Sequence, residues 1–255
     1  MATRASQYYN TIKINILMVK KLITLLLLFG THLIVWGQNS KQNILYNSFF
    51  VTNGDTIRYH SEYDWYFSDV DWLMNKRTNL LALVDSNLNV LTDFKYSRVT
   101  PFYPGFYSAA AMRDGKWGLV NKKGEEVTTF EYSLDPIPCL DTTINKEFFI
   151  FEKENKKGVV DANGDIIVPF KWKDIFYCNY AIFNLKKGRK NYLYYVKTGK
   201  TLSLEKKFFI NQFNKFGKAV LDDNKTGKYG VIDTSGTVIQ PCIYNKEKDV
   251  EKFLK

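Results

Sequence analysis

The chain has 255 residues, of which 45% are hydrophobic and 16% are aromatic. This composition excludes an intrinsically disordered chain, because such chains hold too little apolar surface to form a core. The net charge of +10 includes lysine doublets that stand beside acids, a pattern typical of solvated turns and strand edges rather than of a nucleic-acid-binding face. We therefore expect no nucleic-acid partner.

Residues 1–37 are predicted to be an N-terminal extension followed by a signal peptide. Residues 18–21 are a short basic start, residues 22–29 are an apolar run that extends loosely to Val35, and polar sequence follows Gly37. This order is typical of a secretory signal, with cleavage expected after Gly37. A membrane anchor is the alternative, but the apolar stretch is shorter than the roughly 20 residues that span a bilayer.

The first 17 residues would be an unusual extension of a signal, so we expect the true start at Met18. Removing residues 1–37, which hold four basic residues and no acid, lowers the net charge to +6. The mature chain, residues 38–255, is predicted to be a single repeat domain that is secreted, periplasmic or at the cell surface. It is expected to have no membrane span after cleavage.

A tight-turn signature recurs through residues 38–255 at steps of 34 to 40 residues. A period of this size indicates tandem repeats, each of which covers the apolar face of its neighbour. The six turns centre on Gly54, Leu88, Gly124, Gly164, Gly199 and Gly236.

Each turn joins two β-prone runs, which predicts a β-hairpin with glycine at the position of positive φ. Asp or Asn before the turn, as at Asp161, can accept hydrogen bonds from the turn backbone. A glycine six residues before the turn, as at Gly118 and Gly158, would let a ring or another backbone approach closely. Pro169 and Pro241, at the same phase, are expected to end the second strand, because proline donates no hydrogen bond.

Aromatic residues recur eight positions after four of the turns, and phenylalanine stands two positions before three of them. We expect these rings to fill the space between successive hairpins. A further β-prone stretch precedes each hairpin, which gives about three strands per unit. The predicted fold is therefore all-β: antiparallel hairpin repeats stacked as an open or semi-open array, with propeller-like closure as the alternative.

Three segments carry a resemblance to a known family: GKWGLVNKKGEEV (115–127), KKGVVDANGDIIVPFKW (156–172) and GKYGVIDTSGTVIQPCIY (227–244). They resemble WG-repeat proteins, named for a Trp-Gly pair that only the first of the three segments shows literally, at Trp117–Gly118. The resemblance runs roughly from Asn79 to Tyr244. It implies tandem β repeats in bacterial proteins that are often exported, but it implies no common reaction and no functional residues.

The acids and tryptophans between residues 62 and 72 form the candidate ligand site. A glycosidase uses two carboxylates and often aromatic sugar platforms, and this segment is the least regular part of the chain. Acids beside tryptophan are equally typical of a capping surface on a terminal repeat. The candidate ligand-binding residues are Asp64, Trp65, Asp69, Asp71 and Trp72.

Histidine and cysteine give little support for catalysis or for metal binding. His60 is the only histidine after the signal, and no metal-ligand spacing of Cys or His appears, so we expect no metal and no cofactor. Cys139 and Cys178 stand at nearly the same phase of adjacent repeats, so any disulfide is expected to join these two. Separate burial of these two thiols and of Cys242 is the preferred interpretation.

These observations favour an exported, non-catalytic binding module for an unknown protein or glycan partner. The first alternative is a structural component that associates with itself through a sheet edge. A carbohydrate hydrolase that uses the acids of residues 62–71 is less favoured.

Overall fold

The computed structural model describes strands at 44–46, 49–52 and 55–58, and then residues 69–75, 77–87, 89–204 and 208–255. The fold below is that of the unit formed by residues 42–255. The predicted signal peptide, its cleavage point and the turn centres Gly54 and Leu88 lie outside the described residues. Among the described residues, no helix is long and apolar enough to cross a bilayer.

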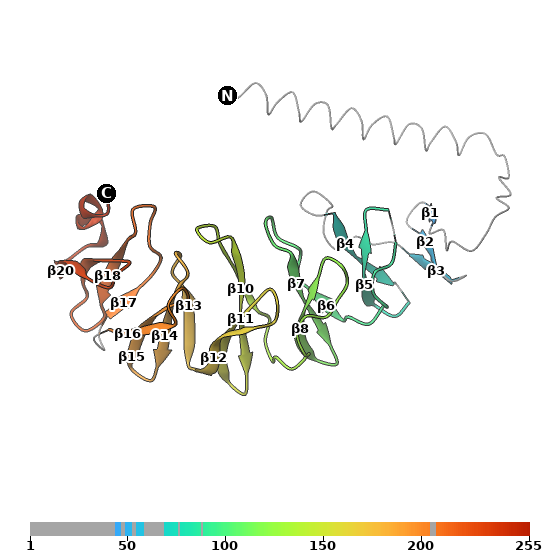
Figure 1. Cartoon of the computed structure of the whole chain (residues 1–255), viewed down its shortest axis with the longest axis horizontal. Helices are drawn as coiled ribbons and strands as arrows, with labels where there is room; N and C mark the ends of the chain where they lie inside the picture. Colours follow the sequence, from blue (N-terminus) through green and yellow to red (C-terminus); the bar gives the residue numbers. More distant parts are fainter. Residues whose placement is uncertain are drawn as a thin grey trace, which may run out of the picture. The chain divides into compact units, whose positions relative to one another are not determined.

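The described chain is a succession of antiparallel β-sheets whose strands follow one another in chain order (Figure 1). The first sheets are smaller: β1 (Ile44–Tyr46), β2 (Phe49–Thr52) and β3 (Asp55–Arg58); then β4 (Val70–Asn75) and β5 (Leu80–Asp85); then β6 (Arg98–Val99), β7 (Ser108–Arg113) and β8 (Lys116–Asn121).

Three four-stranded sheets follow. The first contains β9 (Ile137–Asp141), β10 (Lys146–Lys153), β11 (Lys156–Asp161) and β12 (Ile166–Trp172). The second contains β13 (Asp174–Tyr177), β14 (Ile182–Lys187), β15 (Lys190–Tyr195) and β16 (Lys200–Ser203). The third contains β17 (Phe208–Ile210), β18 (Lys218–Asp223), β19 (Lys228–Asp233) and β20 (Val238–Tyr244).

The antiparallel repeat prediction is confirmed, and the three later sheets have one strand more than the expected three or so per unit. The additional strand is the first of each sheet, β9, β13 or β17. These strands have weak sequence patterns, since β9 contains Pro138 and β17 has only three residues. A four-stranded antiparallel sheet of this kind is the unit of β-propeller blades.

The turns form as their sequence predicts. Asp161 Oδ1 accepts hydrogen bonds from the backbone N–H groups of Asn163 at 2.9 Å and Asp165 at 3.1 Å. Gly164 has φ +90°, a conformation that side chains disfavour. Asn121 and Asp233 accept from their turns in the same way.

The last strands of the first and third four-stranded sheets, β12 and β20, are irregular. The pairing of β11 with β12 shifts register around Val159, and β12 continues past Pro169 to Trp172. The prediction that Pro169 and Pro241 end their strands is therefore wrong. On an outer strand, the missing N–H removes no bond from the ladder, so the strand tolerates proline.

In the two earlier units, threonine hydroxyls support the corresponding irregular stretch. Thr92 Oγ1 accepts from the backbone N–H of Leu83, and Thr128 Oγ1 accepts from that of Leu119, both at 2.8 Å. Because Leu83 and Leu119 are fully buried, these bonds satisfy donors that water cannot reach.

Aromatic rings join neighbouring units at a fixed phase, as the sequence predicts. The ring of Tyr96 stacks on Phe130 at 5.8 Å, and one unit later the ring of Tyr132 stacks on Phe170 at 5.3 Å. Each tyrosine follows its own turn by eight residues, and each phenylalanine follows the next turn by six. The core consists of apolar clusters that each draw on consecutive sheets.

The glycine of the Trp-Gly pair is required by this packing. A Cβ atom on Gly118 would lie 2.8 Å from the ring of Phe130, and one on Gly158 would lie 2.8 Å from the ring of Phe170. Both distances are far below an ordinary contact of roughly 3.5–4.0 Å. The prediction that these glycines admit a ring is confirmed.

The last described residues fold back onto the final sheet. Two short 3₁₀ helices, η2 (Glu247–Asp249) and η3 (Glu251–Phe253), place the ring of Phe253 5.6 Å from that of Tyr244. Asn214 Nδ2 donates to the carbonyl oxygen of Leu254 at 2.7 Å, and Val250 is fully buried.

Candidate functional site

The structure places three of the five candidate ligand residues. Trp72 in β4 is 1% exposed, its indole N–H donates to the carbonyl of Thr100 at 2.9 Å, and its ring stacks on Phe102. Asp71 is also buried, and its Oδ1 accepts from the backbone N–H of Trp72 at 2.7 Å. Trp72 and Asp71 thus have structural contacts.

Asp69 is the exposed member of this set, and its Oδ1 lies 2.9 Å from Lys122 Nζ. Asp64 and Trp65 lie outside the described residues. The ligand site at Asp64, Trp65, Asp69, Asp71 and Trp72 therefore stays a prediction.

Cys139 and Cys178 are buried thiols that are not joined by a disulfide. Each Sγ lies 3.7 Å from a carbonyl oxygen two residues earlier in the chain, that of Ile137 or Phe176. Burial raises the pKa of each thiol to about 12. These thiols are therefore protonated at neutral pH and are poor nucleophiles.

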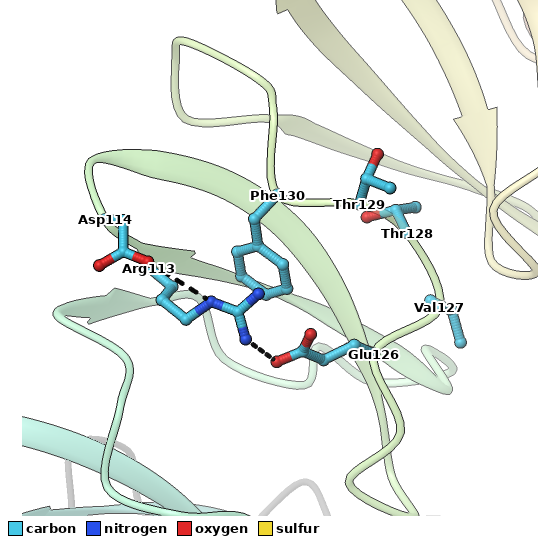
Figure 2. Close-up of a pocket in the computed structure, with 7 residues that line it drawn as sticks. All are labelled: Arg113, Asp114, Glu126, Val127, Thr128, Thr129 and Phe130. Carbon is cyan, nitrogen blue, oxygen red and sulfur yellow. Dashed lines mark hydrogen bonds and ion pairs between the residues drawn. The ribbon is translucent and has the colours of Figure 1, made fainter.

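The strongest candidate site in the described part of the chain is an open groove of about 620 Å³ beside the sheet of β6–β8. We call it the Arg113 groove. Figure 2 shows its lining side chains, which come from the end of β7, the turn after it and the segment after the Gly124 turn. They are Arg113, Asp114, Glu126, Val127, Thr128, Thr129 and Phe130.

Arg113 is held from two sides. Its Nη1 lies 2.6 Å from Glu126 Oε1, and its guanidinium carbon lies 4.5 Å from the centroid of the Phe130 ring (Figure 2). Its Nε lies 3.8 Å from Asp114 Oδ2, in a turn where Asp114 has φ +53°. A cation above an aromatic face and beside a carboxylate has little rotational freedom, so the guanidinium is preorganised.

Glu126 is the centre of a charged network that joins two units. Its Oε1 also lies 2.8 Å from Lys95 Nζ and accepts from the hydroxyl of Tyr96 at 3.1 Å. Partial burial by itself would raise the pKa of Glu126, but hydrogen bonds from Lys95 and Tyr96, with the charges of Lys95 and Arg113, outweigh it and lower that pKa. Glu126 is therefore ionised at neutral pH.

The same network keeps the Tyr96 hydroxyl protonated. Burial, and then the charge of Glu126, raise the pKa of Tyr96 well above its usual value. Tyr96 also stacks on Phe130. Its contacts therefore fix both groups that hold Arg113, the ring of Phe130 and the carboxylate of Glu126. The site thus depends on the stacking of two consecutive units.

The Arg113 groove is suited to binding. It offers a fixed guanidinium donor, a carboxylate acceptor and the hydroxyl of Thr129 in a partly apolar setting, which matches the few placed polar groups of ligand sites. Its lining residues include no Cys, His or Ser that could act as a nucleophile with a base.

The sequence pattern does not reveal this site. Phe130 belongs to the repeat pattern, and Arg113 and Glu126 are 13 residues apart with the Gly124 turn between them. The available signal in the sequence is Arg113 at the end of a strand, followed after the Gly124 turn by Glu126 and by Phe130, which recurs in the repeat pattern.

Solved structures similar to this chain have low sequence identity. A eukaryotic initiation factor is 10% identical with a TM-score of 0.46, over 80% of this chain and 62% of that chain. Hsv2 of Kluyveromyces lactis is 9% identical with a TM-score of 0.39, over 68% of this chain and 59% of that one. The virginiamycin B lyase of Staphylococcus aureus is 16% identical with a TM-score of 0.34, over 76% and 72%. At these TM-scores, the similarities support no conclusion about function.

A repeat family matches part of the chain in sequence. No curated protein matches this chain in sequence. The WG containing repeat matches residues 117–134, which include most of β8 and the Gly124 turn, and residues 158–188, which run from β11 to β14. The chain therefore contains sequence that matches the WG containing repeat over these two segments.

Proposed function

We propose that this chain is an exported, non-catalytic binding module for a glycan or protein, and that the Arg113 groove is part of its binding surface. The observation that carries the proposal is the fixed position of Arg113 between the Phe130 ring and Glu126. Ordering a long side chain on binding costs about 0.5–1.5 kcal/mol. Since the fold already holds this guanidinium, a ligand would avoid most of that cost.

The non-catalytic part of the proposal is supported by what the described carboxylates do. Asp161 and Asp233 accept hydrogen bonds from their own turns, and Glu126 accepts from three side chains. Each of these acids therefore has a structural role through one carboxylate oxygen, Oδ1 of the two aspartates and Oε1 of Glu126.

Substituting one arginine tests the binding role. Arg113→Gln in the purified chain, screened on a glycan array and a peptide array, should weaken binding of the best ligand about tenfold, the effect of losing one charged contact. Arg98→Gln is the matched control, because Arg98 also lies over a ring (Trp117, 5.2 Å) and pairs with an acid (Asp135, 2.7 Å) but does not line the groove. An equal loss in both variants would refute a role for the groove.

The hydrolase alternative has its own test. The triple variant Asp64→Asn, Asp69→Asn and Asp71→Asn should show the same turnover as the unaltered chain on a panel of oligosaccharides, because we propose that neither hydrolyses them. Turnover by the unaltered chain that disappears in the triple variant would establish the hydrolase.

Self-association is a second candidate function, favoured by the outer strand of the last sheet. Val238, Ile239 and Ile243 in β20 are 44%, 38% and 58% exposed, an unusual apolar content for a solvated strand. Pro241 in the middle of this strand donates no hydrogen bond, which weakens edge-to-edge pairing. Sedimentation of the chain over a hundredfold concentration range should therefore show a monomer, and a concentration-dependent dimer lost in Ile243→Lys would favour self-association.

A further inference from the structure

The hairpin tip between β14 and β15 is an unneutralised basic cluster. Gly188, at φ +61°, forms the turn, and Lys187, Arg189 and Lys190 around it are exposed, with Lys186 half-buried. Residues 182–204 contain no Asp or Glu. The tip therefore carries four positive charges and has no acid in its own hairpin.

Two more lysines lie beside this tip. The backbone N–H of Lys173 donates to the carbonyl of Lys186 at 2.8 Å, and Asp174 is the register partner of Lys186, so the start of β13 runs along the end of β14. Lys171 and Lys173 are both exposed. We call this cluster the basic edge; its members are Lys171, Lys173, Lys186, Lys187, Arg189 and Lys190.

The acid in register with Lys186, Asp174, forms its ion pair with a lysine outside the basic edge. Asp174 Oδ1 lies 2.5 Å from Lys157 Nζ, which comes from the preceding sheet. Within the part of the chain that the structure describes, none of the six cations forms an ion pair. Six uncompensated charges in one place create a strong local potential.

The fold itself does not require this charge. The equivalent tips between the second and third strands of other sheets mix both signs: Arg113 stands beside Asp114, Lys153 beside Glu154, and Lys225 close to Asp223. The tips after β7 and β10 have two-residue loops, as the β14–β15 tip does, and they fold with Asp114 or Glu154 in the loop. A loop of this length therefore does not require the absence of acids. A ligand of opposite charge supplies a reason for it.

We propose that the basic edge binds an acidic polysaccharide, which makes it a second ligand site distinct from the Arg113 groove. A polyanion that contacts several cations releases condensed counterions, and this release favours binding to a cluster more than to scattered lysines. Acidic polysaccharides outside the cell are accessible to this surface if the export part of the proposed function holds.

The chemistry of the tip favours a polysaccharide over other polyanions. Lys187, Gly188 and Arg189 present no apolar side chain to insert into a membrane interface and no aromatic ring on which a nucleobase could stack. Lysine ammonium groups are flexible point charges, which suit the repeated carboxylates or sulfates of a polysaccharide chain.

The test measures binding of the full chain to immobilised alginate, which carries carboxylates, and heparin, which carries sulfates, between 50 and about 300 mM salt. The quadruple variant Lys186→Gln, Lys187→Gln, Arg189→Gln and Lys190→Gln should bind at least about tenfold more weakly and show a shallower dependence of log Kd on log salt. Binding of either polysaccharide with this loss supports the proposal.

A second quadruple variant controls for net charge. Lys225→Gln, Lys228→Gln, Lys246→Gln and Lys248→Gln also removes four charges, from one half-buried and three exposed lysines in the last sheet and its C-terminal segment. It should bind within about twofold of the unaltered chain, since its charges lie outside the basic edge.

Three outcomes would overturn the proposal: no binding at 50 mM salt, an equal loss in both quadruple variants, or tighter binding to single-stranded DNA or to vesicles with anionic lipids than to either polysaccharide. The Arg113 groove has its own test, the array screen of Arg113→Gln, which leaves all six cations of the basic edge in place. Failure of the basic edge and failure of the Arg113 groove are therefore separate results.

Discussion

Replacing Gly158 with alanine tests the packing that defines the repeat. A Cβ atom at this position would lie 2.8 Å from Cγ and Cδ1 of Phe170 and 2.9 Å from Cδ2. An ordinary carbon contact is roughly 3.5–4.0 Å, so the ring has to move by about 1 Å. Phe170 stacks on Tyr132 at 5.3 Å, and the movement would disturb the contact between units.

The direction of the stability change shows whether the ring of Phe170 really occupies the space beside Gly158. Overpacking of this kind costs about 1–3 kcal/mol. Gly158 does not have positive φ, so in open space the same substitution would stabilise the strand by about 0.5–1 kcal/mol. We therefore expect Gly158→Ala to lower the free energy of unfolding by about 1–3 kcal/mol.

Urea unfolding followed by tryptophan fluorescence measures this change, and Phe170→Leu supplies the control. When the ring is absent, the added methyl group has room, so Gly158→Ala should cost much less in the Phe170→Leu background than in the unaltered chain. A stabilised Gly158→Ala variant, or an equal cost in both backgrounds, would refute the reasoning.

The remaining predictions concern a carboxylate, a hydroxyl and the N-terminus. Burial would raise the pKa of Asp141, but hydrogen bonds from Thr143, Tyr177 and the Ala181 N–H outweigh it and lower that pKa. The ionised carboxylate therefore stabilises the fold fully above about pH 4, and this stabilisation is lost as the pH falls through the lowered pKa. Asp141→Asn should be less stable than the unaltered chain at pH 7, and the difference between their urea midpoints should shrink in acid. Thr128→Val leaves a buried N–H without its acceptor and should cost about 1–3 kcal/mol in the same assay, whereas an unchanged midpoint would exclude the hydroxyl's role. Mass spectrometry of protein exported from a bacterial host should show a chain that begins after Gly37, and an intact N-terminus on exported protein would contradict the signal-peptide prediction.

The sequence predicted the features that depend on local chemistry. Asp161 and Gly164 specify a turn by side-chain hydrogen bonding and by backbone freedom, and both properties follow from residue type. The glycine at Gly118 and the ring at Phe130 recur in phase, so their contact could be expected from the alignment of repeats.

Features that depend on register or on contacts between sheets were not predictable in this way. Whether β12 continues past Pro169 depends on its outer position in the sheet, which the sequence does not state. The short first strands of the later sheets form because a neighbouring strand pairs with them, and their own sequence pattern is weak.

The candidate site was missed for the same reason. Glu126 meets Lys95 and Tyr96 because two units stack, and these residues are 30 or 31 positions apart. No repeated sequence pattern predicts this contact, because Ile166 occupies the position equivalent to Glu126 in the next repeat. Polar sites built between repeats are thus harder to find than the repeats themselves.

The central claim is that successive units are joined by a tyrosine stacked on the phenylalanine of the next unit. A double-mutant cycle of Tyr132→Leu and Phe170→Leu, measured by urea unfolding, tests it most directly. The account predicts a coupling energy of about 0.5–1.5 kcal/mol for this stacked pair. The control cycle combines Tyr96→Leu with Phe170→Leu, two residues whose units are separated by one intervening unit. Its coupling energy should not exceed about 0.5 kcal/mol. Equal coupling in the two cycles, or none in the first, would contradict the account.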